Sequence, residues 1–249
     1  MNRQNDSLPC IIFPMGVEAY QFLGRVEVLQ RWKRGKATYR KVFFEGRHLL
    51  VVRCGMGPER AATAVRHLDE APAAILCAGS AGGLVPDLTV GDLVVSSETV
   101  AGDAPCDIVA GHVPLVENIV RVCRRENRNY RIGRVVTVNN AVFPKEDRRR
   151  LHRETGAAAV DMESHAIGME AAKRSVPFAA LRVISDDLDS PSLPDIRDFK
   201  HIWRRPLELH RRLPELWRWR AFLRDFRRAV SVLHPVLVGV LRDVAAGRK

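Results

Sequence analysis

Strand-length apolar runs that end in glycine or acidic residues alternate with helical segments along most of this chain. The clearest runs are AAILCAG (73–79), which leads into GSAGG, and PFAALRVI (177–184), which leads into Ser185 and Asp186. Continuous apolar runs of this length are typical of strands covered on both faces. The alternation continues to about residue 190 and predicts an α/β fold, a three-layer sandwich around a mixed, mostly parallel sheet.

The same patterns locate the other elements. We expect helices at 18–32, 58–71, 114–126, 145–156 and 165–175. We expect further strands at 10–14, 88–100, 131–140 and 158–161, and a strand pair within 36–55 that turns at Glu45-Gly46. From about residue 196 the chain becomes basic and rich in Trp, which indicates one or two C-terminal helices.

Length and composition favour a single domain over residues 1–249, with 196–249 as a basic helical extension. No stretch approaches the roughly 20 apolar residues of a membrane span. The first ten residues have no secretory signal, so we expect a cytoplasmic protein. The five cysteines are scattered, with no CxxC pair and no His at ligand spacing, so we expect reduced thiols, no metal and no cofactor.

Three motifs at strand ends are candidates for chemistry. GSAGG (79–83) is either an ordinary turn or a place where the backbone approaches a ligand closely. DMES (161–164) either caps a helix or offers a carboxylate to the cis-diol of a ribose. In RVISD (182–186), Asp186 is either a solvated turn residue or a general acid. Each motif alone leaves both interpretations open.

Together, in this order and spacing, the motifs resemble the nucleoside phosphorylase/nucleosidase superfamily, and in particular its methylthioadenosine/S-adenosylhomocysteine nucleosidase branch. The resemblance runs from about Cys10 to Asp189. The segments that carry it are IIFPMGVEA, VVRCGMGPERAA, AGSAGGLVPDLTVGDLVVS, AVDMESHAIGMEAA and VPFAALRVISD. It implies an N-glycosyl hydrolase that binds an adenine nucleoside and forms a homodimer.

The resemblance also implies site residues. Glu18 matches the glutamate that activates the attacking water, and Asp186 matches the aspartate that donates a proton to the purine. Glu163 matches the glutamate at the ribose hydroxyls, and Asp161 stands where the family more often has glutamate. The implied substrate-binding residues are Met15, Ser80, Gly82, Val142, Phe143, Asp161, Met162, Glu163 and Ser185. Because the two catalytic carboxylates have opposite duties, we expect Asp186 to be the more protonated.

Whether the nucleophile is water or phosphate is indicated by the positions at which the phosphorylases of this superfamily carry phosphate-binding arginines. PMGVEA has no arginine near Glu18, and the second arginine position holds Cys77. A phosphate dianion beside Glu18 would be poorly compensated, so hydrolysis is expected. Arg53 is the residue that could substitute as a phosphate ligand, and a purine nucleoside phosphorylase is therefore the alternative.

The C-terminal segment bears on the substrate. Ten cationic residues between Lys200 and Arg228 alternate with Trp203, Trp217, Trp219 and two Phe. This is either a solvated helix packed by its apolar face or a surface that rests on anionic lipid. The second interpretation resembles the hopanoid-associated branch, which implies adenosylhopane as substrate and peripheral membrane contact.

Other functions remain open. Methylthioadenosine, S-adenosylhomocysteine and futalosine are alternative substrates, and a non-enzymatic nucleic-acid or membrane binder is an alternative of another class. The net charge of +11 permits nucleic-acid binding. However, no known nucleic-acid motif occurs, and we expect no nucleic-acid partner.

Overall fold

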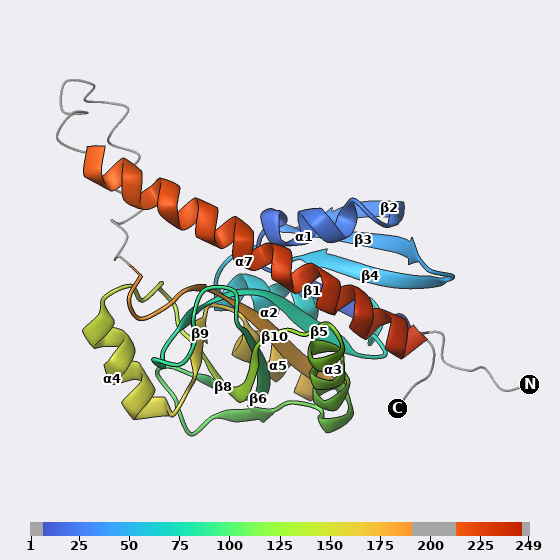
Figure 1. Ribbon diagram of the computed structural model, residues 1–249. Helices are drawn as coiled ribbons and strands as arrows, with labels where there is room; N and C mark the ends of the chain where they lie inside the picture. The colour runs from blue at the N-terminus through green and yellow to red at the C-terminus, as the bar shows by residue number, and fades with distance from the viewer. Residues whose placement is uncertain (1–6, 191–212, 246–249) are drawn as a thin grey trace, which may run out of the picture.

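The computed structural model describes residues 7–190 and 213–245, and its described strands form one mixed sheet (Figure 1). The strands are β1 (Cys10–Phe13), β2 (Glu27–Arg34), β3 (Ala37–Phe44), β4 (Arg47–Arg53), β5 (Ile75–Gly83), β6 (Leu93–Ala101), β7 (Ile108–Ala110), β8 (Tyr130–Thr137), β9 (Ala159–Asp161) and β10 (Phe178–Asp186). The helices are α1 (Gly16–Leu23), α2 (Pro58–Arg66), α3 (Val113–Arg125), α4 (Lys145–Thr155), α5 (Ser164–Lys173) and α7 (Leu213–Ala245).

The sheet has the order β10-β6-β8-β9-β5-β1-β4-β3-β2, and β7 pairs with β6. Because β10 also pairs with β5, the strands from β10 to β5 close on themselves, and β1, β4, β3 and β2 extend the sheet outward from β5. β1 and β10 both run parallel to β5, so the carboxyl ends of these strands meet at one edge of the sheet. Ligands of open α/β sheets gather at such an edge.

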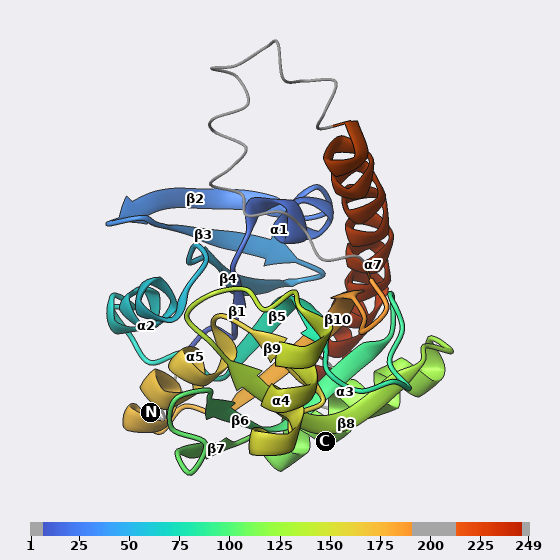
Figure 2. The same ribbon diagram turned by 90° about the vertical axis from the view of Figure 1, so that its left-hand side faces the viewer.

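Helices cover both faces of the sheet and make the three layers that the sequence predicts. Apolar residues of α1, α3 and α7 pack into one core cluster with the sheet, and those of α2 and α5 pack into another. Figure 2 shows α7 along one side and α2 with α5 on the other. Phe13 and Phe22 are fully enclosed in the first cluster, and Tyr39 in the second, where its hydroxyl donates to the Ala64 carbonyl at 2.9 Å.

The structure corrects two of the expected elements. The helix expected to reach residue 32 ends at Leu23, and residues 27–34 form β2, which pairs antiparallel with β3. The Trp32 ring stacks on Tyr39 of β3 at a centroid distance of 5.6 Å, a cross-strand contact that helical periodicity cannot reveal. The strand expected to end at Gly79 continues through GSAGG to Gly83, so of the two interpretations left open for this motif, the ordinary turn is wrong.

The C-terminal helix α7 belongs to the core over much of its length. Ala229, Leu233, Val236, Leu237 and Leu241 are buried, and the helix contacts α1, α3, β5 and β10. Residues 191–212, including Trp203, lie outside the described residues, as do the side chains of Trp217 and Trp219. Within the ranges 7–190 and 213–245, no helix is both long enough and apolar enough to span a bilayer.

Candidate active site

A cavity of about 310 Å³ lies at the carboxyl ends of β1, β5 and β10. Every site residue predicted from the sequence lines it: Met15, Glu18, Ser80, Gly82, Val142, Phe143, Asp161, Met162, Glu163, Ser185 and Asp186. Three residues of α7 also line it: Leu223, and Phe222 and Phe226, which the sequence assigned to the basic C-terminal segment and not to the site. The structure therefore brings the predicted residues together, while their roles stay predictions.

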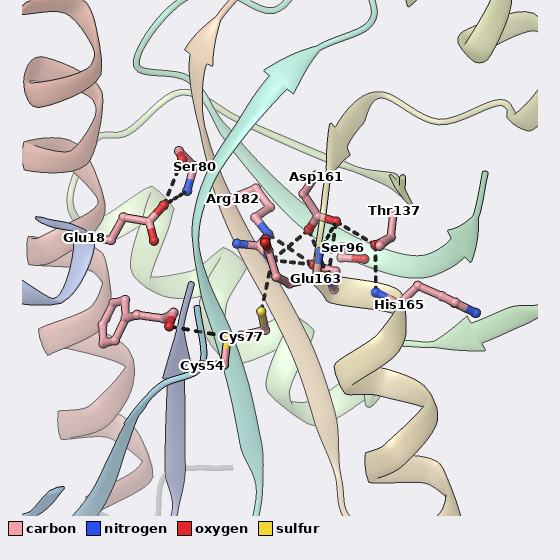
Figure 3. Close-up of polar contacts among 12 residues, drawn as sticks. Glu18, Cys54, Cys77, Ser80, Ser96, Thr137, Asp161, Glu163, His165 and Arg182 are labelled. Atoms are coloured by element: carbon pink, nitrogen blue, oxygen red, sulfur yellow. Dashed lines mark hydrogen bonds and ion pairs between the residues drawn. The ribbon is translucent and has the colours of Figure 1, made fainter. Parts of the chain in front are cut away.

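Glu18 is held by donors from two neighbouring segments. It lies in the first turn of α1, where its Oε2 accepts the Met15 backbone N–H at 2.8 Å. Its Oε1 accepts both the backbone N–H and the hydroxyl of Ser80, each at 2.8 Å (Figure 3). Burial raises the pKa of Glu18 above its ordinary value, although these hydrogen bonds and the charge of Arg182 oppose the rise. A fixed carboxylate with a raised pKa is suited to accept a proton.

The glycines of GSAGG provide the space that the carboxylates need. A Cβ atom on Gly79 would lie 2.5 Å from Nη1 of Arg182 and 3.0 Å from Oε1 of Glu18. A Cβ atom on Gly82 would lie 3.3 Å from Oδ2 of Asp186. Within this strand, glycine is therefore required for the close approach of charged side chains rather than for a turn.

Arg182 is a fully buried cation behind the cavity wall. Its Nη2 lies 2.7 Å from Oδ2 of Asp161 and 2.9 Å from the Ser164 hydroxyl. Its Nη2 also lies 3.0 Å from the thiol of Cys77, whose pKa burial raises to about 12 (Figure 3). Cys77 is therefore a neutral neighbour of the arginine.

The carboxylate of Asp161 is fully engaged by protein donors. Besides the ion pair with Arg182, it accepts the Thr137 hydroxyl at 2.6 Å and the backbone N–H groups of Glu163 and Ser164. Its side chain is only 1% exposed. The predicted contact of Asp161 with substrate does not fit this geometry, because its carboxylate accepts the N–H groups at the start of α5 and neutralises Arg182 instead.

Glu163 is the carboxylate of the DMES motif that faces the cavity. Its Oε1 accepts the backbone N–H of Gly57 at 2.8 Å. Burial, together with the nearby charge of Asp161, raises the pKa of Glu163 to about 7. A second acceptor oxygen remains for a ligand hydroxyl, since a carboxylate can accept several hydrogen bonds.

Asp186 is paired with a buried arginine. Its Oδ1 accepts the Ser185 hydroxyl at 2.6 Å, and its Oδ2 forms an ion pair with Arg148 of α4. The sequence did not indicate this pairing, and the expectation that Asp186 is more protonated than Glu18 stays a prediction.

A family model described as the phosphorylase superfamily matches residues 10–207. The chain belongs to the phosphorylase superfamily. A relative in this superfamily, the 5'-methylthioadenosine/S-adenosylhomocysteine nucleosidase of Oceanobacillus iheyensis, is 33% identical over 150 residues, which are 53% of this chain and 65% of the relative. The enzyme of the same name from Chromohalobacter salexigens is 27% identical over 195 residues, 71% of this chain and 83% of the relative.

Solved structures of nucleosidases share the fold of this superfamily member. The 5'-methylthioadenosine/S-adenosylhomocysteine nucleosidase of Neisseria meningitidis, in complex with methylthio-immucillin-A, aligns with a TM-score of 0.78 at 20% identity, over 95% of this chain and 99% of that one. The futalosine hydrolase of Helicobacter pylori aligns with a TM-score of 0.77 at 19% identity, over 95% of this chain and 98% of that one. At this identity the likeness shows the fold.

Sequence reasoning missed two charged residues of this phosphorylase-superfamily site. Arg182 could have been noticed, because a single arginine inside the apolar run PFAALRVI must find a buried counter-charge. Arg148 belongs to the run KEDRRRLHRET, in which nothing distinguishes it from its neighbours. Among the described residues, no group of His, Cys, Asp and Glu is arranged to hold a metal ion.

Proposed function

We propose that this chain hydrolyses the N-glycosidic bond of an adenine nucleoside and releases adenine, with Glu18 and Asp186 as its catalytic residues. The observation that carries the proposal is that two carboxylates distant in sequence line one cavity together with Glu163. Relatives and structural neighbours that are named as nucleosidases support it.

The chemistry divides between the carboxylates. Glu18, fixed by Ser80 and Met15, would take a proton from the water that attacks the anomeric carbon. Glu163 would bind the ribose hydroxyls and, with Glu18, favour the positive charge that grows on the sugar in the transition state. Asp186 would provide the leaving base with its proton, a contribution of roughly 10²–10⁴-fold for a positioned acid.

The charges around the cavity support water as the nucleophile. Among the described residues that line it, Arg148 is the only lysine or arginine, and it already pairs with Asp186. Cys77 is a neutral buried thiol. Arg53, the substitute considered for a phosphate ligand, does not line the cavity and points a guanidinium nitrogen toward the Thr38 hydroxyl at 3.4 Å.

The nucleophile is tested by measuring adenine release chromatographically in phosphate-free buffer and again with added phosphate. We expect release without phosphate. The anomeric carbon of the sugar product should then carry a hydroxyl group rather than a phosphate. A strict requirement for phosphate would contradict hydrolysis and show that the protein is a phosphorylase.

The catalytic roles are tested by Glu18→Gln and Asp186→Asn. Each should lower kcat by orders of magnitude while circular dichroism and thermal melting show a folded protein. Full activity in either variant would remove the assigned role. A wild-type protein that binds nucleosides but never cleaves them would favour the non-enzymatic alternative.

For the substrate we propose an adenosyl lipid such as adenosylhopane. Phe222, Leu223 and Phe226 give the cavity an apolar wall from α7, and Val17 and Met56, which also line it, are partly exposed. Such a rim suits an apolar 5' substituent. Turnover of a panel of adenine nucleosides tests this, and methylthioadenosine, S-adenosylhomocysteine or futalosine cleaved as well as the lipid would contradict it.

The assembly and location of the protein stay predictions. We propose a cytoplasmic homodimer that touches anionic membranes through its basic C-terminal segment, consistent with the exposed Arg220, Arg224, Arg227 and Arg228 of α7. Sedimentation velocity measures whether the protein is a dimer. Co-sedimentation with vesicles of phosphatidylglycerol, compared with vesicles of phosphatidylcholine, measures binding to anionic membranes.

A further inference from the structure

Arg148 connects the two segments that flank the end of the cavity near Asp186. From α4 its Nε donates to the Val142 carbonyl at 2.8 Å, which holds the 141–144 loop. Its Nη1 donates to the Asp187 carbonyl at 2.8 Å, and its Nη2 pairs with the Asp186 carboxylate. Its Nη1 also donates to the Asp186 carbonyl at 3.3 Å, so the rigid fork of one guanidinium holds a carboxylate and three backbone carbonyls at once.

The charge of Arg148 constrains the charge of Asp186. The arginine side chain is 3% exposed, and Asp186 is the carboxylate that neutralises it. A buried arginine stays protonated, and a buried charge without a partner is strongly unfavourable. Loss of the Asp186 charge would leave Arg148 in that unpaired state.

Other groups around Asp186 do not replace this partner. Its own strand supplies the neutral Ser185 hydroxyl, and α7 faces the cavity with the apolar Phe222, Leu223 and Phe226. The remaining ionisable groups that line the cavity are Glu18, Asp161 and Glu163, and the cation nearest to them, Arg182, is paired with Asp161. Lys145 of α4 pairs with the exposed Asp189 instead.

We propose that Arg148 is the positioning residue of Asp186, which it orients toward the substrate and keeps ionised until substrate binds. This inference rests on the proposed function, in which Asp186 provides the leaving base with a proton.

An ionised Asp186 must first take that proton from solvent. It then passes the proton to a ring nitrogen of the base as the bond between the anomeric carbon and the base nitrogen breaks. The attacking water bonds to the anomeric carbon through its oxygen and gives one proton to Glu18, which returns it to solvent. One proton enters and one leaves, so the reaction is balanced as hydrolysis.

The test is the pH dependence of adenine release by the full-length protein, measured with methylthioadenosine and with adenosylhopane as separate substrates. The basic limb of kcat/KM reports the acid of the free enzyme. Arg148→Met removes the charge that keeps Asp186 ionised, so this limb should move to higher pH by about one unit or more. Loss of the fork should also lower kcat by about tenfold or more. Arg148→Lys keeps the charge without the fork, so kcat should fall while the limb stays near that of wild type.

Lys145→Met is the matched control, because it removes the other cation that joins α4 to the end of β10. It should leave both the limb and kcat close to wild type. Thermal melting checks every variant, and Arg148→Gln, which still donates to carbonyls, replaces Arg148→Met if that protein does not fold. A uniform loss of activity with an unmoved basic limb in the uncharged variant would reduce Arg148 to a structural role. Absence of adenine release from both substrates by wild type at every pH would instead overturn the proposed function and this inference with it.

Discussion

Replacing Gly79 by alanine tests whether the glycine-rich end of β5 exists to admit charged side chains. The new Cβ would lie 2.5 Å from Nη1 of Arg182, 3.0 Å from Oε1 of Glu18 and 3.1 Å from Cδ of Pro14. All three distances are shorter than ordinary van der Waals contact, about 3.5–4.0 Å between carbon atoms. At least one of these groups must therefore move.

Arg182 has little freedom to move. It is fully buried and is held by Asp161 at 2.7 Å and by the Ser164 hydroxyl at 2.9 Å. Overpacking against such a fixed group should cost about 3 kcal/mol, the upper part of the usual range. For a chain of this length, that corresponds to a Tm lower by roughly 6–12 °C. Displacing Glu18 by a fraction of an ångström should also lower kcat by about tenfold or more.

Gly83→Ala is the matched control in the same strand. Its Cβ would meet its nearest neighbours at 3.5 Å, which is ordinary contact. Differential scanning calorimetry and adenine release should show Gly83→Ala close to wild type and Gly79→Ala impaired in both. Equal melting temperatures for the two variants would show that Gly79 is not packed against Arg182 and Glu18.

Three further perturbations test the buried charges and the C-terminal helix. Asp161→Asn leaves Arg182 without its ion-pair partner and should lower the free energy of unfolding by about 3–5 kcal/mol in urea titrations, whereas Asp69→Asn, at a pair with a 67% exposed carboxylate, should cost less than about 1 kcal/mol. Burial raises the pKa of Glu163 from 4.5 to about 7, so the folded protein holds this proton more tightly than the unfolded chain does. The free energy of unfolding should therefore fall as the pH rises from about 4.5 to about 7. Glu163→Gln should flatten that decline, and an unchanged slope would contradict the assignment. Gly239→Ala places a Cβ 2.5 Å from Val122 of α3 and should lower the free energy of unfolding by about 1–3 kcal/mol, while Ser231→Ala, at an exposed position of the same helix, should be close to neutral in the same measurement.

The apolar runs made the sheet readable from the sequence. Buried strands such as β5 and β10 carry continuous hydrophobic residues. The turn at Glu45-Gly46 has positive φ angles at both residues, as a two-residue turn between antiparallel strands requires. β2 was misread because its side chains are largely exposed, so burial imposes no alternation on it and pairing with β3 alone makes it a strand.

The candidate site divides in the same way. Motif spacing located the residues that line the cavity. The carboxyl ends of the parallel strands β1, β5 and β10 meet at one edge, whereas DMES follows β9, which pairs antiparallel with β5. Spacing did not show how the carboxylates share their partners. The carboxylate of Asp161 forms an ion pair with Arg182. Asp186 forms an ion pair with Arg148, which belongs to a helix far from it in sequence.

The sequence by itself determined most of the order of strands and helices, with β2 and β7 as exceptions, and the carboxylates at the strand ends, since hydrophobic periodicity and strand length are local properties. Only the tertiary structure decided which of those carboxylates face the cavity and which cation neutralises each one. Charge pairing depends on distances of a few ångströms between segments, and no local pattern encodes such distances. For the same reason, the apolar wall from α7 became visible only when that helix was placed beside the strand ends.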